Sequence, residues 1–247
     1  MRCLAVLLAL VVLPGVAAAT PDPEPCEVAP QFVTATRLLE PLKAAIDAGG
    51  PVQILAVGSG STVGANSVQP DNAFPYRMLD ALRAALPKVA FDLTVLGGRG
   101  MTAEEMLPLV KAQVRRTPTQ LVLWQTATVE AIRGMRPDRM RQALREGLDA
   151  IRAAGGSLVL IDPQFTRALR ANTDVEPYQT ELQQVARLPG AALFHRYDVT
   201  RFWVLQDRID PERASKDTRE AELARLNVCL GQALARYVLS GAGMAAP

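Results

Sequence analysis

The sequence has 247 residues, of which 49% are apolar and 21% are charged, and its formal net charge is +2. This composition is typical of a globular protein with enough apolar material for one α/β domain. The near balance of charges gives no electrostatic basis for binding nucleic acid, and the Lys and Arg residues are spread over helical segments. We therefore predict no nucleic-acid partner.

The N-terminus has the features of a secretory signal peptide. Arg2 precedes a short apolar stretch, residues 4–13, and Ala17–Ala19 have the small residues of a cleavage site. We expect residues 1–19 to be removed and the mature protein to be periplasmic or secreted. No cysteine follows the cleavage site directly, and no later segment has 18 consecutive apolar residues. The sequence therefore predicts no stable membrane anchor after signal cleavage.

Two cysteines, Cys26 and Cys229, remain once Cys3 leaves with the leader. An even pair of cysteines in an oxidising compartment favours a disulfide. Such a bond would tie the N-terminal segment to the last helix and close most of the chain into one loop. Two unrelated buried thiols are the alternative interpretation.

Residues 20–50 are predicted to form an extended arm and a short helix, and residues 241–247 a disordered tail. Between them, residues 51–240 alternate short apolar runs with amphipathic stretches. The predicted strands are 52–57, 89–96, 119–125, 157–161 and 191–195, and the predicted helices are 73–86, 102–116, 138–154, 176–187, 198–206 and 218–239. This alternation predicts a three-layer α/β/α sandwich around a five-stranded parallel sheet of flavodoxin-like order.

The first predicted strand ends in a loop of small and hydroxyl residues, Gly58–Gly64. Ligands of open α/β sheets bind at this end of the strands. A dinucleotide loop would need a helix that begins within it and an acid after the second strand. Here the next predicted helix begins at residue 73 and the second strand ends in Leu96 and Gly97. The late helix also disfavours a flavin-phosphate loop, and a Walker loop lacks its Gly-Lys-Ser/Thr, so we predict no cofactor.

Six blocks, in order along the chain, resemble an exported subfamily of the SGNH (GDSL-type) hydrolases. They are 58–64 (GSGSTVG), 72–79, 96–100, 122–133 (VLWQTATVEAIR), 162–164 (DPQ) and 227–230 (NVCL). The resemblance covers about residues 26–237 and implies the SGNH fold. The family consists of serine esterases that transfer an acyl group to a serine. A histidine oriented by an aspartate is the base, and backbone and asparagine donors hold the oxyanion.

By the same resemblance, the family's catalytic positions carry other residues in this chain. They are Gly60 for the nucleophile, Val129 for the oxyanion asparagine, Ala221 for the base histidine and Thr218 for its aspartate. Gly98 matches the oxyanion glycine and supplies a backbone donor. His195, at the end of the fifth strand, is the only histidine in the chain. The resemblance thus implies the fold and argues against the family's activity.

Ser59 and Ser61 flank the vacated position, and one of them paired with His195 would give an unorthodox site. Adjacent residues at a strand end point to opposite sides, so both serines are expected to face away from the direction of Gly60. Arg99, in the second glycine-rich loop, would be able to bind a carboxylate or sulfate group. One histidine and scattered acids give no metal-ligand spacing, so we predict no metal site.

The resulting hypothesis is an exported, non-catalytic binding or accessory protein. Its partner would be a cell-envelope glycan, an acylated small molecule or a partner enzyme, and the candidate binding residues are Ser59, Ser61, Gly98 and Arg99. The alternative is an SGNH-type esterase or acetylesterase with an unorthodox serine site. A third interpretation is a scaffold without a small-molecule ligand.

Overall fold

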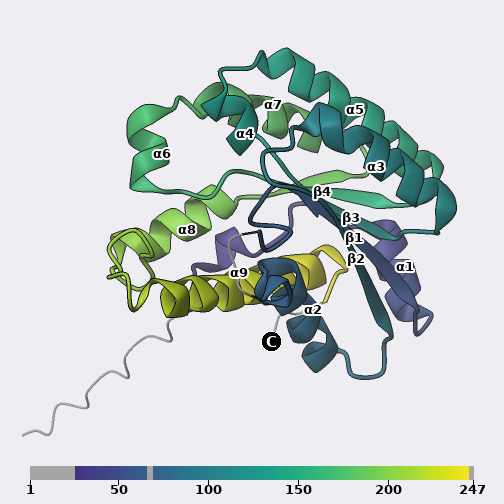
Figure 1. The fold of residues 1–247 in the computed structure, drawn as a ribbon. Helices are drawn as coiled ribbons and strands as arrows, with labels where there is room; N and C mark the ends of the chain where they lie inside the picture. The colour runs from purple at the N-terminus through teal and green to yellow at the C-terminus, as the bar shows by residue number, and fades with distance from the viewer. Residues whose placement is uncertain (1–25, 66–68, 245–247) are drawn as a thin grey trace, which may run out of the picture.

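The computed structural model describes residues 26–65 and 69–244, so the predicted signal peptide lies outside the described residues. The strands are β1 (Val52–Gly58), β2 (Phe91–Gly97), β3 (Leu121–Gln125), β4 (Ser157–Ile161) and β5 (Ala191–Phe194). Within the described residues they form one five-stranded sheet in the order β2-β1-β3-β4-β5, with every neighbouring pair parallel (Figure 1). This is the flavodoxin-like order that the sequence predicts.

Helices cover both faces of the sheet (Figure 1). The α-helices are α1 (Glu40–Asp47), α2 (Phe74–Ala85), α3 (Ala103–Arg116), α4 (Thr128–Ile132), α5 (Pro137–Ala153), α6 (Arg167–Asn172), α7 (Glu176–Ala186), α8 (Arg196–Leu205) and α9 (Arg219–Gly241). Two 3₁₀ helices, η1 (Pro30–Phe32) and η2 (Pro70–Asn72), precede α1 and α2. None of the helices in the described ranges is long and apolar enough to cross a membrane.

The two helical layers enclose two cores. Helices α1, α2, α8 and α9 pack on one face of the sheet, and α3, α5 and α7 pack on the other. Along β1 the side chains alternate between them, with Ile54 and Ala56 in the first core and Leu55 and Val57 in the second. Every residue of β3 and β4 is buried. This is expected of central strands in a parallel sheet that is covered on both faces.

The N-terminal segment is fixed against the last two helices. Cys26 is joined to Cys229 of α9, which confirms the predicted disulfide. The indole N–H of Trp203 donates to the carbonyl of Glu27 at 3.1 Å, and the N–H of Leu39 donates to the carbonyl of Gly241 at 2.7 Å. Residues 241–244, which were predicted to belong to a disordered tail, therefore lie against the domain. The rest of that predicted tail, 245–247, lies outside the described residues.

Two short helices were not predicted from the sequence. Helix α4 follows Ala127, which adopts the left-handed φ of 76°, and it occupies a segment predicted as a loop. Helix α6 begins where the Glu212 carboxylate accepts the backbone N–H groups of Arg167 and Ala168. The N-cap residue Thr166, whose hydroxyl accepts the Leu169 N–H at 2.9 Å, is a local signal for this helix, and the contribution of the distant Glu212 is not visible in the local sequence.

Candidate functional site

The first loop is held in place by one buried side chain at the end of β3. The Oε1 atom of Gln125 accepts hydrogen bonds from the Ser59 N–H and the Ser59 hydroxyl, both at 3.0 Å, and from the Thr62 hydroxyl at 3.2 Å. Gln125 is 2% exposed and Ser59 is 8% exposed. A Cβ atom on Gly58 would lie 2.2 Å from the Thr62 hydroxyl oxygen, so only glycine fits where β1 turns into the loop.

Gly60, the position that the resemblance gives to the nucleophile, has room for a side chain. A Cβ atom built there would have the methyl carbon of Ala65 as its nearest neighbour, at 3.8 Å. That distance is an ordinary van der Waals contact. The loop therefore has space for a serine at this position, but the residue present carries only hydrogen.

Ser61 contacts a buried arginine rather than the histidine. Arg196, the first residue of α8, donates from Nη1 to the Ser61 hydroxyl at 3.1 Å and from Nη2 to the Gln164 side-chain carbonyl. Its guanidinium also lies over the Phe74 ring, 5.1 Å from the ring centre. Arg196 is 2% exposed, and this burial lowers its pKa to about 10, although nearby Asp162 acts in the opposite direction. Ser59 and Ser61 thus bond to different elements, β3 and α8.

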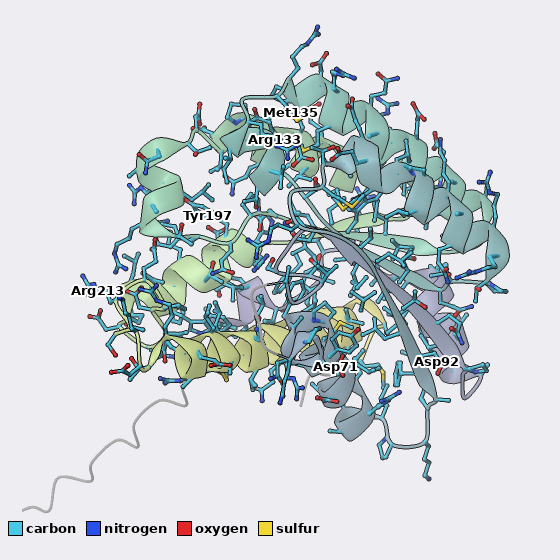
Figure 2. The ribbon with its side chains drawn as sticks, in the orientation of Figure 1. Asp71, Asp92, Arg133, Met135, Tyr197 and Arg213 are labelled. Carbon is cyan, nitrogen blue, oxygen red and sulfur yellow. A yellow bond between two sulfur atoms is a disulfide. The ribbon has the colours of Figure 1, made fainter. Side chains whose placement is uncertain are left out.

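The second glycine-rich loop lies beside the first. The N–H of Gly98 donates to the carbonyl of Gly58 at 3.2 Å, so this donor is already engaged in the conformation described. Arg99 is exposed and donates to the carbonyl of Ala65 at 3.0 Å. Arg133, which follows α4 (Figure 2), was not singled out from the sequence. Its Nη2 atom would lie 3.2 Å from a Cβ on Gly100.

Helix α4 carries the position of the family's oxyanion asparagine. That residue is Val129, whose side chain has no hydrogen-bond donor. The next residue, Glu130, is 2% exposed, and its Oε1 accepts the Ala103 N–H at 2.6 Å and the Thr126 hydroxyl at 2.8 Å. Glu130 therefore ties the end of β3 to the start of α3, which is a structural role.

His195 lies near two carboxylates, one directly after β4 and one in the first turn of α8. Its Nδ1 is 3.9 Å from Asp162 Oδ2 and 4.0 Å from Asp198 Oδ2, beyond hydrogen-bonding distance. Asp162 is buried and accepts the Tyr197 N–H at 2.8 Å; Figure 2 shows Tyr197 near the start of α8. Burial raises the pKa of Asp162 to about 7 despite this hydrogen bond. In the described structure His195 makes no hydrogen bond to either loop serine.

The positions that the resemblance gives to the base and its aspartate lie at the start of α9. Thr218 is the N-cap residue of α9, and its hydroxyl is 2.9 Å from the Ser215 hydroxyl. Ala221 lies in the first turn, and both residues are exposed. Over residues 26–65 and 69–244, no cluster of three or more His, Cys, Asp or Glu side chains is arranged to hold a metal ion.

A parallel sheet of this order, with a Gly/Ser loop after β1 and an Asp-Pro-Gln turn after β4, defines an SGNH-type hydrolase fold. The sequence matches the Non-GDSL lipase-like family over residues 25–244, and the chain belongs to that family. No curated protein matches the sequence significantly.

Solved structures of esterases share this fold. The two-domain esterase CEX, active on acetylated mannans and co-crystallised with mannopentaose, is 14% identical, with a TM-score of 0.66 over 87% of this chain and 56% of its own. LAE5, an α/β hydrolase from the metagenome of Lake Arreo in Spain, is 17% identical. Its TM-score is 0.59, and the match covers 79% of this chain and 96% of LAE5. The psychrotrophic esterase EstA from Pseudoalteromonas sp. is 16% identical. Its TM-score is 0.52, and the match covers 71% of this chain and 94% of EstA. At these identities the similarity shows the fold alone.

Proposed function

We propose that the protein is an exported, non-catalytic member of the SGNH fold that binds a ligand at the cell envelope. The observation that carries this proposal is the composition of the first loop. Gly60 has no oxygen with which to attack a carbonyl, and the hydroxyls beside it are engaged by Gln125 and Arg196. Nucleophilic catalysis needs a hydroxyl within reach of a base, and this loop offers none.

The remaining parts of the family mechanism are replaced as well. Ala221 stands where the base histidine is expected, Thr218 stands where its orienting aspartate is expected, and Val129 stands where an oxyanion donor is expected. Loss of a triad in a serine hydrolase lowers turnover by on the order of 10⁶-fold, and the residual rate comes from the oxyanion hole and substrate binding. One oxyanion donor is also replaced, so we expect no significant turnover by the family mechanism.

The proposed ligands are a cell-envelope glycan, an acylated small molecule or a partner enzyme. The signal-like N-terminus supports a periplasmic or secreted location. Esterases are among the solved structures with a similar fold, and one of them acts on acetylated mannans. A binding protein on this fold would retain affinity for related molecules without cleaving them.

Restoring the missing hydroxyl tests this proposal. Gly60→Ser should fold, because the nearest atom to the new Cβ is 3.8 Å away, and it should hydrolyse p-nitrophenyl acetate no faster than the wild type. The reason is that, among the described residues, the only neighbouring atom within 4 Å of a Cβ at this position is the Ala65 methyl carbon, so no base is expected within reach of the new hydroxyl. Thr62→Ser is the matched control, because it is a conservative change in the same loop and keeps the hydroxyl that donates to the Gln125 side chain. A rate increase of about 100-fold or more in Gly60→Ser would overturn the assignment of a missing base, because it would reveal a working one. Turnover by the wild type itself would overturn the non-catalytic proposal.

A further inference from the structure

Two adjoining hollows follow β5 at the edge of the sheet, away from the first loop. The larger, about 870 Å³, lies between α7, the segment after α6 and the start of α8. The smaller, about 550 Å³, lies between α7, the segment of residues 31–37 and α9. Gln183 and His195 line both hollows, so the two adjoin at these side chains. We call the combined feature the β5 groove, and each half is within the size range of ligand pockets.

The polar groups of the β5 groove are mostly side-chain amides and hydroxyls. Gln179 and Thr180 line the larger hollow, and Gln31 and Thr34 line the smaller one. Amides and hydroxyls each donate and accept hydrogen bonds, as the hydroxyls of a sugar do. Each hollow also has a partly buried aromatic residue in its lining, Tyr197 in the larger and Phe32 in the smaller. Such rings provide apolar surface for the C–H faces of a sugar.

The charged side chains of the groove have both signs. The larger hollow has three carboxylates and one guanidinium, and the smaller has two guanidinium groups: Asp174, Glu176, Asp198 and Arg170, then Arg37 and Arg187. A polymer with uniform charge would meet like charges in one of the two halves, which is unfavourable. An uncharged chain avoids this repulsion along the whole groove.

The edge of β5 is poorly suited to an added peptide strand. The strand has only four residues, and the carbonyl of Leu193 already accepts a hydrogen bond from the Tyr237 hydroxyl at 2.9 Å. Strand addition draws its affinity from a row of such backbone groups. The observations therefore favour a ligand recognised by its hydroxyls over an extended peptide.

We propose that the β5 groove binds a neutral glycan chain, with Gln183 and His195 contacting the sugar at the junction of the two hollows. Both residues are accessible there, since Gln183 is exposed and the His195 side chain is 44% exposed. The inference takes its ligand class from the proposed binding function, but it places that ligand at a site separate from the first loop.

Calorimetric titration of the full-length mature protein with cellopentaose, mannopentaose and chitopentaose tests this inference. At least one neutral pentasaccharide should bind, and Gln183→Ala and His195→Ala should each weaken that binding about tenfold. Gln184→Ala is the matched control, because Gln184 is an exposed neighbour on α7 that does not line the groove, and it should bind as the wild type does.

Three results would overturn the inference: no binding of any of the three sugars at millimolar concentration, equal affinities in all variants, or tighter binding of pentagalacturonic acid than of the neutral chains. Failure here is distinguishable from failure of the proposed function. Ester hydrolysis by the wild type would refute the non-catalytic role and leave glycan binding in the groove intact. Loss of glycan binding without hydrolysis would refute only the groove.

Discussion

Replacing Gln125 by methionine tests how the first loop is anchored. The substitution keeps an unbranched side chain of similar size, so it leaves no large cavity, but it removes the oxygen that accepts three hydrogen bonds from Ser59 and Thr62. Each buried hydrogen bond contributes about 1 kcal/mol net, and the Ser59 N–H is left without its acceptor. We therefore expect Gln125→Met to lower the free energy of unfolding by roughly 3 kcal/mol.

Urea denaturation followed by circular dichroism measures this loss. Gln142→Met is the control, because Gln142 is exposed on α5 and its replacement should change stability by less than about 0.5 kcal/mol. A loss below about 1 kcal/mol in Gln125→Met, similar to that of the control, would show that the Gln125 side chain does not anchor the loop. The geometry assigned to Ser59 would then be wrong as well.

Two further predictions concern stability. Replacing Cys26 by serine and Cys229 by alanine opens a loop with a sequence separation of 203, so unfolding should become easier by up to roughly 5 kcal/mol, and a loss under about 1 kcal/mol in urea would contradict this. Burial raises the pKa of Asp162 from 3.8 to about 7, so the folded state retains a proton that the unfolded state has lost. This group's contribution therefore makes the wild type less stable as the pH rises from about 4 to about 7. Asp162→Asn should lose less stability than the wild type between about pH 5 and pH 8. Equal losses would argue against a raised pKa for the Asp162 carboxyl.

The strands were predictable from the sequence because their signals are local. Short apolar runs bounded by glycine and proline gave the strands, and Thr102 with Glu105 forms the capping box expected at the start of α3. The disulfide was predicted because two cysteines remain after the expected loss of the signal peptide. By contrast, α6 has only six residues and one local cap, Thr166, and its first N–H groups are bound by the distant carboxylate of Glu212, which local patterns do not reveal.

For the candidate site, the sequence predicted which family residues are replaced but not the contacts of the residues present. The resemblance gives Gly60 the nucleophile position, but it did not show where the flanking hydroxyls point. Arg196 was missed because an arginine after a strand ordinarily faces solvent, whereas here it is buried against Phe74 and holds Ser61. The one feature of the sequence that could have pointed to a role for Arg196 at the site is its position beside His195, directly after β5.

The most direct test of the central claim is a rate measurement with p-nitrophenyl acetate on the purified mature wild type, beside Ser59→Ala and Ser61→Ala. A non-catalytic protein should release p-nitrophenol at the rate of buffer alone, and both variants should match it. Turnover by the wild type that disappears in either variant would contradict the account, because it would show that a hydroxyl beside Gly60 attacks the ester.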